Sequence, residues 1–138
     1  MTAMDAKELF EISMETMMRT ETSNITDFNP RIEHAILGMA DEAGEFVSAM
    51  KRCKYYNKPL DILNLEEEAG DMIWYLNLLI HEIAVLRNLP VLDIYKDIVL
   101  ANRAKLETRY PDGFSNDDAN DRDLGKEREA MEDVVDKK

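Results

Sequence analysis

The sequence predicts an all-α fold, a bundle of four to five helices followed by a mobile acidic tail. Apolar residues recur at helical spacing in four long segments, and no segment alternates between apolar and polar with the period of a strand. Glycine (5) and proline (4) are scarce, which favours long helices over a turn-rich β architecture. The 138 residues suffice for one domain with a sizeable core.

The first two predicted helices cover residues 3–20 and 30–54, joined by a polar linker at 22–29. The apolar residues of the first are Phe10, Met14, Met17 and Met18. Asn29 before Pro30 is typical of an N-cap followed by proline at the first helical position. One arc of the second helix collects Ile32, Ala35, Ile36, Met39, Ala43, Phe46, Val47 and Met50.

A loop at 55–60 leads to a third predicted helix over 61–87, where Asn64 and Glu67 have the spacing of a capping box. Its main apolar arc consists of Leu65, Ala69, Met72, Ile73, Leu76, Ile80 and Ile83. A second stripe consists of Trp74, Leu78 and Val85. A helix that is apolar on two sides is usually buried in a bundle or at an interface between subunits.

The fourth predicted helix covers 91–108, after a break at Asn88-Leu89-Pro90, and a turn follows at 110–114. Its apolar face carries Tyr95, Ile98, Val99 and Leu106. Residues 115–138 are polar and charged, which predicts a partly disordered tail with at most a short helix near 126–135. We therefore expect a helical domain over 1–114 and a tail over 115–138.

The charge balance restricts the partners. With 17 basic and 29 acidic residues the formal charge is −12, which argues against nucleic acid or an anionic membrane as the main partner. The single cysteine, Cys53, excludes an internal disulfide and fits a reducing compartment. No apolar run approaches the ~20 residues of a membrane span, and the acidic N-terminus is unlike a signal peptide. A cytoplasmic protein is expected.

Two near-identical tetrapeptides, Glu-Ala-Gly-Glu at 42–45 and Glu-Ala-Gly-Asp at 68–71, point to a metal site. Each places two carboxylates three residues apart, on one face of a helix. They begin 26 residues apart, which allows two antiparallel helices to bring the four acids together. Because like charges held together need a cation, Glu42, Glu45, Glu68 and Asp71 are the candidate ligands of a divalent metal.

A solvated acidic face is the alternative, since several other acidic pairs in the chain have the same spacing. The two central pairs differ because they border apolar arcs and because Gly44 and Gly70 each cost about 1 kcal/mol of helix propensity. Those glycines could instead serve close helix packing. Carboxylate ligands favour Mg²⁺ or Mn²⁺, and the absence of Glu-x-x-His pairs at this spacing disfavours a di-iron centre.

Cationic and polar side chains could bind phosphate near such a site. Lys51, Arg52 and Lys54 cluster at the end of the second helix, where complementing the helix dipole is an equal alternative. Asn102, Lys105 and Arg109 lie on or beside the apolar face of the fourth helix, where snorkelling to the bundle edge is the alternative. His34 could contact substrate or be structural. A glycine-rich phosphate loop is missing, which excludes a P-loop mechanism.

Together these residues resemble the MazG-like all-α NTP pyrophosphohydrolase superfamily, and its single-domain phage and bacterial members in particular. The match covers residues 30–115 and rests on the four acids in order and spacing. It extends to His34-Ala-Ile-Leu-Gly38, Ile73-Trp-Tyr-Leu76, Asn102-Arg-Ala-Lys105-Leu106 and Arg109-Tyr-Pro-Asp-Gly-Phe114.

The resemblance implies hydrolysis of a (d)NTP between its α and β phosphates, giving a monophosphate and pyrophosphate. The four acids would hold Mg²⁺, for which Mn²⁺ could substitute, and Glu45 or Glu42 would orient or deprotonate the attacking water. Implied substrate contacts are Lys51, Lys54, Asn102, Lys105, Arg109, Tyr110 and His34. A homodimer or homotetramer in the cytoplasm of a bacterium or phage-infected cell is also implied.

Three alternatives stay open at this point. Two are activities of the same fold, a dUTP/dUDP hydrolase and a phosphoribosyl-ATP pyrophosphohydrolase. The third is a non-catalytic helical dimer that acts as an interaction module, which the intact acids on both helices disfavour. The preferred base and sugar are not specified by these residues.

Overall fold

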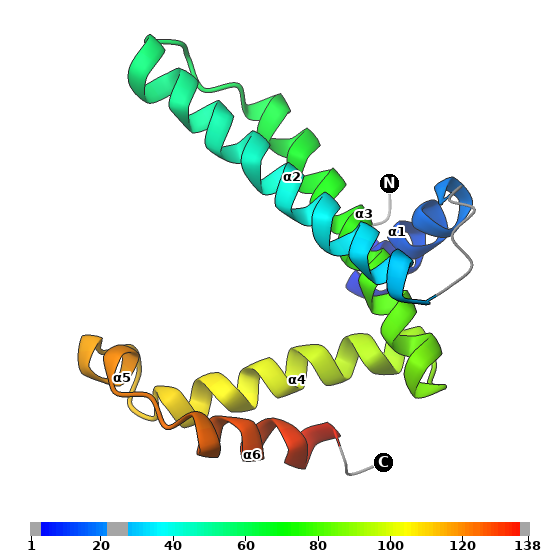
Figure 1. Cartoon of the computed structure of the whole chain (residues 1–138), viewed down its shortest axis with the longest axis vertical. Coiled ribbons are helices and arrows are strands. Elements are labelled where there is room, and N and C mark those ends of the chain that lie inside the picture. The colour runs from blue at the N-terminus through cyan, green and yellow to red at the C-terminus, as the bar shows by residue number, and fades with distance from the viewer. Residues whose placement is uncertain (1–3, 22–27, 136–138) are drawn as a thin grey trace. The chain divides into compact units, whose positions relative to one another are not determined.

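The computed structural model describes residues 4–21 and 28–135, of which 28 and 29 are described by their backbone alone. These residues form six helices and no strand (Figure 1), so the all-α prediction is confirmed. The chain divides into two compact units, Met1–Arg87 and Asn88–Lys138. The division therefore falls after α3, whereas we expected a domain over 1–114 and a separate tail. The linker predicted at 22–29 lies almost entirely outside the described residues.

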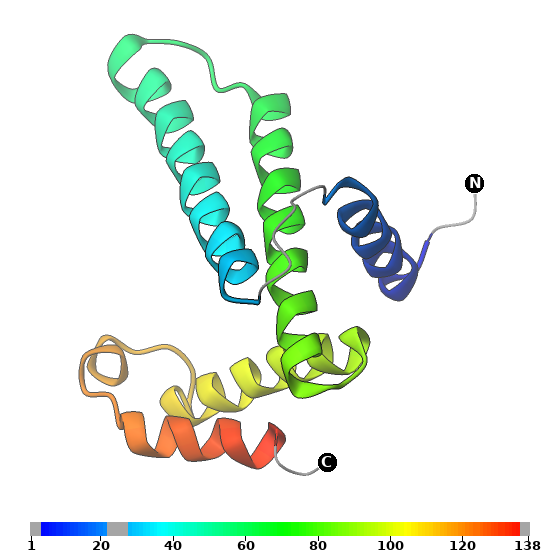
Figure 2. The same cartoon turned by 45° about the vertical axis from the view of Figure 1, so that its right-hand side comes forward.

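In the first unit, α2 (Phe28–Tyr56) and α3 (Ile62–Arg87) form an antiparallel hairpin, and α1 (Ala6–Thr20) packs against α3 (Figures 1 and 2). Each helix agrees with its predicted range within three residues at either end. A capping box between Asp5 and Glu8 starts α1. The buried apolar side chains of this unit are Met14, Met17, Ala35, Ala49, Leu78, Ile80 and Ala84.

Small residues let α2 and α3 approach each other closely. Gly38 is buried under the ring of Tyr75, and a Cβ added at Gly38 would lie 2.1 Å from that ring. Gly44 and Gly70 differ, since an added Cβ would meet nothing within 4 Å at either position. Close packing within this chain therefore explains Gly38 but not the two glycines of the acidic tetrapeptides.

The start of α3 differs from the predicted capping box. The carboxylate of Asp61 accepts the backbone N–H of Asn64 at 3.1 Å, so Asp61 caps the helix. The prediction that Asn64 and Glu67 form the cap is wrong, because the helix begins at Ile62 and Asn64 already lies within its first turn. The side chain of Asn64 is thereby available for other contacts.

The hairpin leaves many large apolar side chains exposed. Those of α2 are Ile36, Leu37, Val47, Met50, Tyr55 and Tyr56, and those of α3 are Ile62, Leu63, Ile73, Leu76, Val85 and Leu86. Only part of each predicted apolar arc is therefore buried within the chain. Among the described residues one helix, α3, is long and apolar enough by length and composition to cross a membrane, a property that core helices of soluble proteins share.

In the second unit, α6 (Leu124–Val135) packs along α4 (Val91–Arg109), with the short helix α5 (Asn116–Asn120) between them in the chain (Figure 2). Segment 115–135 is thus mostly helical, whereas we expected a partly disordered tail with at most a short helix near 126–135. Charged and polar groups order it, because Ser115 caps α5 and Asp123 accepts the backbone N–H of Lys126 at the start of α6.

The packing of α6 is anchored by an ion pair that hydrophobic periodicity does not reveal. Arg109 donates from Nε and Nη2 to the two carboxylate oxygens of Glu127, at 2.9 and 2.7 Å, and Arg122 donates to the same carboxylate. Glu127 is buried. The predicted apolar face of α4 is largely exposed, whereas Ile94 and Asp97 are buried, so residue type alone assigned the wrong face.

We expect Glu127→Gln to loosen α6 from α4, since it removes the charge that two guanidinium groups share. Both arginines hold the pKa of the Glu127 carboxyl well below its usual range. A lowered pKa means that this contribution to stability is complete above the ordinary glutamate pKa of about 4.5 and is lost as the pH falls further. Protection factors of the α6 amides, which correct for the intrinsic pH dependence of hydrogen exchange, are measured from pH 7 to pH 3. They should fall with acid in the wild type and be low throughout in the variant. Equal protection in both proteins at pH 7 would contradict this account.

Candidate metal centre

Three carboxylates from the two helices of the hairpin come together. Glu42 lies in the middle of α2, and Glu68 and Asp71 lie on the facing part of α3. One oxygen of each carboxylate lies within 4.8 Å of the others. Glu68 is only 8% exposed, Glu42 is half-buried and Asp71 is exposed, so the cluster opens to solvent on one side.

The electrostatics of this cluster suit a cation. Burial and the neighbouring Asp71 and Glu68 carboxylates raise the pKa of Glu42, and a hydrogen bond to Glu68 adds to the effect. Within residues 4–21 and 28–135, no lysine or arginine forms an ion pair with any of the three acids. None of the described lysines and arginines therefore neutralises the negative charge of these three acids.

The donor set fits a small hard ion. Two oxygens bound to one Mg²⁺ at about 2.1 Å are at most about 4.2 Å apart, so small side-chain rotations would bring the three oxygens onto one ion. Carboxylate oxygens are also the ligands that Mg²⁺ and Mn²⁺ prefer. Glu42, Glu68 and Asp71 can thus hold a divalent cation.

Glu45 is not part of this cluster. It is exposed, and the group of converging acids does not include it. The structure thus brings together three of the four predicted metal ligands.

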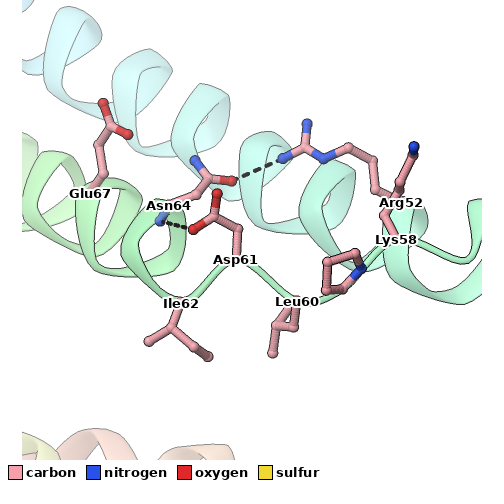
Figure 3. Close-up of a pocket in the computed structure, with 8 residues that line it drawn as sticks. Arg52, Lys58, Leu60, Asp61, Ile62, Asn64 and Glu67 are labelled. Atoms are coloured by element: carbon pink, nitrogen blue, oxygen red, sulfur yellow. Dashed lines mark hydrogen bonds between the residues drawn. The ribbon is translucent and has the colours of Figure 1, made fainter.

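Two polar residues that the sequence analysis did not assign to the metal ligands or their supports contact Glu68 directly or through one another. Asn64 donates from Nδ2 to Glu68 Oε1 at 2.6 Å. Arg52 in turn donates from Nη2 to Asn64 Oδ1 at 2.9 Å (Figure 3). The spacing of four residues between Asn64 and Glu68 is the signal that could have indicated this contact.

A pocket of about 320 Å³ adjoins the acids. Its lining residues are Thr20, Glu42, Asp71, Trp74 and Tyr75. The Trp74 indole donates to the Thr20 hydroxyl at 2.5 Å, and the rings of Trp74 and Tyr75 meet edge to face with centroids 5.0 Å apart. Burial, followed by the charge of Glu42, raises the pKa of Tyr75. Aromatic walls beside an acidic cluster suit a flat ring that carries phosphate groups.

His34 lies close to this pocket without lining it. Its ring centroid is 5.6 Å from that of Tyr75 and 6.3 Å from that of Trp74, both in edge-to-face geometry. Its Nδ1 is 3.8 Å from a carboxylate oxygen of Glu21. In this arrangement His34 supports the aromatic walls, and direct contact with substrate stays a prediction.

The cations at the end of α2 divide into two groups. Lys51 lies 5.9 Å from the ring centroid of Tyr56, and Lys54 lies 5.4 Å from that of Tyr55. Arg52 and Lys58 instead line a pocket of about 680 Å³ at the turn between α2 and α3 (Figure 3). Of the cations in this segment, Arg52 is the one that the structure connects to the acid cluster, through Asn64.

The remaining predicted contacts belong to the second unit, so their relation to the acids stays a prediction. Asn102 is exposed and Lys105 is half-buried on α4. Arg109 is engaged with Glu127. Tyr110 packs against Phe114, with ring centroids 5.4 Å apart, and its ring is 5.6 Å from the Arg109 guanidinium.

No protein-family model, curated protein or solved structure matches this chain significantly. The candidate centre therefore rests on its own residues and on the resemblance of its motifs.

Proposed function

We propose that this chain is a Mg²⁺-dependent nucleoside triphosphate pyrophosphohydrolase that converts a (d)NTP to a (d)NMP and pyrophosphate. The observation that carries the proposal is the cluster of Glu42, Glu68 and Asp71, which pairs with no lysine or arginine in the described part of the chain and adjoins an aromatic pocket. The proposed reaction, cleavage between the α and β phosphates, is inferred from the motif resemblance to the MazG-like superfamily. A cytoplasmic location is proposed with it.

In this proposal Glu42, Glu68 and Asp71 hold Mg²⁺, or Mn²⁺ in its place. When bound, the ion neutralises phosphate charge and lowers the pKa of a coordinated water. Glu45 lies one turn beyond Glu42 and is exposed, so its carboxylate is available to orient the attacking water and accept its proton. Glu42 is the alternative base.

The nucleoside would lie against Trp74 and Tyr75, which wall the pocket beside the acids. The predicted phosphate contacts are Lys51, Lys54, Asn102, Lys105, Arg109 and Tyr110, with His34 near the aromatic walls. Arg109 would have to exchange Glu127 for phosphate to take part, whereas the half-buried Lys105 forms no ion pair among the described residues.

A nucleotide panel tests the function. Purified protein is incubated with each canonical dNTP and NTP, with dUTP, dUDP and phosphoribosyl-ATP, in Mg²⁺ and in EDTA. The proposal requires Mg²⁺-dependent formation of monophosphate and pyrophosphate from at least one triphosphate. Preference for dUTP with dUDP, or for phosphoribosyl-ATP, would select one of the two related activities. Release of inorganic phosphate with a diphosphate would contradict the proposed bond, and no turnover would favour a non-catalytic module.

We also propose that the chain forms a homodimer or homotetramer through the α2–α3 hairpin. Val47 is 67% exposed, and other large apolar residues of both helices are exposed with it. Large exposed apolar side chains gathered on two packed helices are typical of an interface between subunits. Sedimentation velocity should show an oligomer for the wild type and a lighter species for Val47→Glu. The control Leu124→Glu, at an exposed position on α6, should keep the wild-type mass, and a monomeric wild type would overturn the proposal.

A further inference from the structure

We propose that Asn64 is a positioning residue that fixes the Glu68 carboxylate for the metal, and that Arg52 fixes the orientation of Asn64. This inference rests on the proposed function, because it assumes that Glu68 is a metal ligand. It assigns a role to two residues near the turn of the hairpin. The sequence analysis placed Asn64 in a helix cap and Arg52 in a group of candidate phosphate-binding cations.

The first step is the short contact between Asn64 and Glu68. Asn64 Nδ2 donates to Glu68 Oε1 at 2.6 Å, and the two residues are four apart on α3, so both side chains lie on one face of the helix. Glu68 is buried, and one of its carboxylate oxygens lies within 4.8 Å of an oxygen of Glu42. A buried carboxylate beside two like charges needs a donor that holds it in place, and Asn64 provides this donor.

The second step is the control of the Asn64 amide by Arg52. A guanidinium group only donates hydrogen bonds, so the contact of Arg52 Nη2 with Asn64 at 2.9 Å requires that the carbonyl oxygen faces Arg52. The NH₂ group then necessarily faces Glu68. Arg52 comes from the end of α2 and Asn64 from the start of α3, so the chain of contacts crosses the hairpin (Figure 3).

The third step is the charge that this arrangement preserves. A lysine or arginine in direct contact with Glu68 would neutralise the carboxylate and compete with a metal ion for it. A neutral amide placed between Arg52 and Glu68 orients the carboxylate without cancelling its charge. Groups that orient metal ligands in this way typically contribute 10–100-fold to metal affinity. The helix does not depend on the Asn64 side chain for its start, since Asp61 is the cap.

The test is Mn²⁺ binding without nucleotide, measured by titration calorimetry and by the EPR signal of free Mn²⁺. Asn64→Leu removes the donor at similar size and should weaken Mn²⁺ affinity about tenfold. Asn64→Asp puts an oxygen where the NH₂ group lies and should weaken it at least as much. Arg52→Gln should weaken it by a few-fold, because the amide can then reverse. The matched control is Glu67→Gln. Glu67 is exposed and lines the pocket at the turn between α2 and α3 together with Arg52 and Asn64, and this variant should bind Mn²⁺ as the wild type does.

A double-mutant cycle separates positioning from general loosening of the hairpin. Once Glu68→Gln has removed the carboxylate, adding Asn64→Leu should cause no further loss of Mn²⁺ affinity. An additive loss in the cycle, or wild-type affinity in both Asn64 variants, would overturn the inference and leave the proposed function intact. A wild-type protein that binds no Mn²⁺ would instead overturn the metal centre itself. If Asn64→Leu does not fold, Asn64→Asp and Arg52→Gln decide the question.

Discussion

Glu42→Gln and Asp71→Asn are each expected to lower Mg²⁺-dependent pyrophosphate release by about 10³-fold while leaving the protein helical. Both changes keep the size of the side chain and remove one carboxylate from the cluster on the α2–α3 hairpin. The loss should appear in kcat as well as in kcat/KM, since the ligands act in the transition state as well as in binding. Circular dichroism and steady-state kinetics check the two halves of the prediction.

The matched control is Glu66→Gln, which removes an exposed carboxylate from α3 two residues before Glu68. It should keep near wild-type turnover, because Glu66 is not part of the acid cluster. Near wild-type turnover in either Glu42→Gln or Asp71→Asn would contradict the assignment of the metal ligands.

Glu42→Gln, which is expected to lower activity, should raise the stability of the metal-free protein. Burial and the neighbouring acids raise the pKa of Glu42, so ionised Glu42 destabilises the metal-free fold. A raised pKa means that stability is highest below the ordinary value of 4.5 and is lost as the pH rises through the raised value. At pH 7 in EDTA, Glu42→Gln should therefore raise the Tm, by a few degrees at most. A lower Tm would show that Glu42 has a stabilising partner in the folded protein.

Gly38→Ala is expected to destabilise the hairpin even though alanine is the better helix former. The added Cβ would lie 2.1 Å from the Tyr75 ring, and Tyr75 is held by edge-to-face contacts with Trp74 and His34. Overpacking of this kind costs about 1–3 kcal/mol, which exceeds or offsets the gain of about 1 kcal/mol in helix propensity. The Tm should fall by roughly 5 °C, and the fluorescence of Trp74 should change because its neighbour moves.

Gly44→Ala provides the comparison on the same helix. Nothing lies within 4 Å of the added Cβ, so this change should leave the monomer unharmed or stabilise it by up to about 1 kcal/mol. Equal effects at Gly38 and Gly44 would show that contact with Tyr75 is not what requires glycine. A destabilised Gly44→Ala would indicate that a second subunit packs at this position in the assembly.

Periodicity and capping rules predicted the four long helices because those helices have extended apolar arcs and terminal signals. Phe10, Met14 and Met17 locate α1, and Pro30 locates the beginning of α2 to within two residues. After residue 115, α5 was not predicted and α6 was predicted only as a short helix near 126–135, because charged contacts such as the one between Arg109 and Glu127 order this segment. No pattern within a single helix reveals a pair of residues 18 positions apart.

The residues of the acid cluster were likewise only partly predictable from sequence spacing. Repetition of the tetrapeptide predicted that Glu42, Glu68 and Asp71 meet, and the structure brings them together. The spacing could not exclude Glu45, because the pairs Glu42/Glu45 and Glu68/Asp71 have the same three-residue step and only the second pair lies wholly in the cluster. Asn64 was assigned to the cap because its distance from Glu67 fits a capping box, whereas its distance from Glu68 fits the contact that the structure shows.

The most direct test of the central claim is identification of the phosphorus-containing products by ³¹P NMR. The wild type and Glu42→Gln are incubated in parallel with a triphosphate that the panel identifies, in Mg²⁺ and in EDTA. We predict signals of a nucleoside monophosphate and pyrophosphate for the wild type in Mg²⁺, and unchanged triphosphate in the other three samples. Inorganic phosphate with a diphosphate, or turnover that persists in EDTA or in Glu42→Gln, would contradict a metal-dependent pyrophosphohydrolase built on these acids.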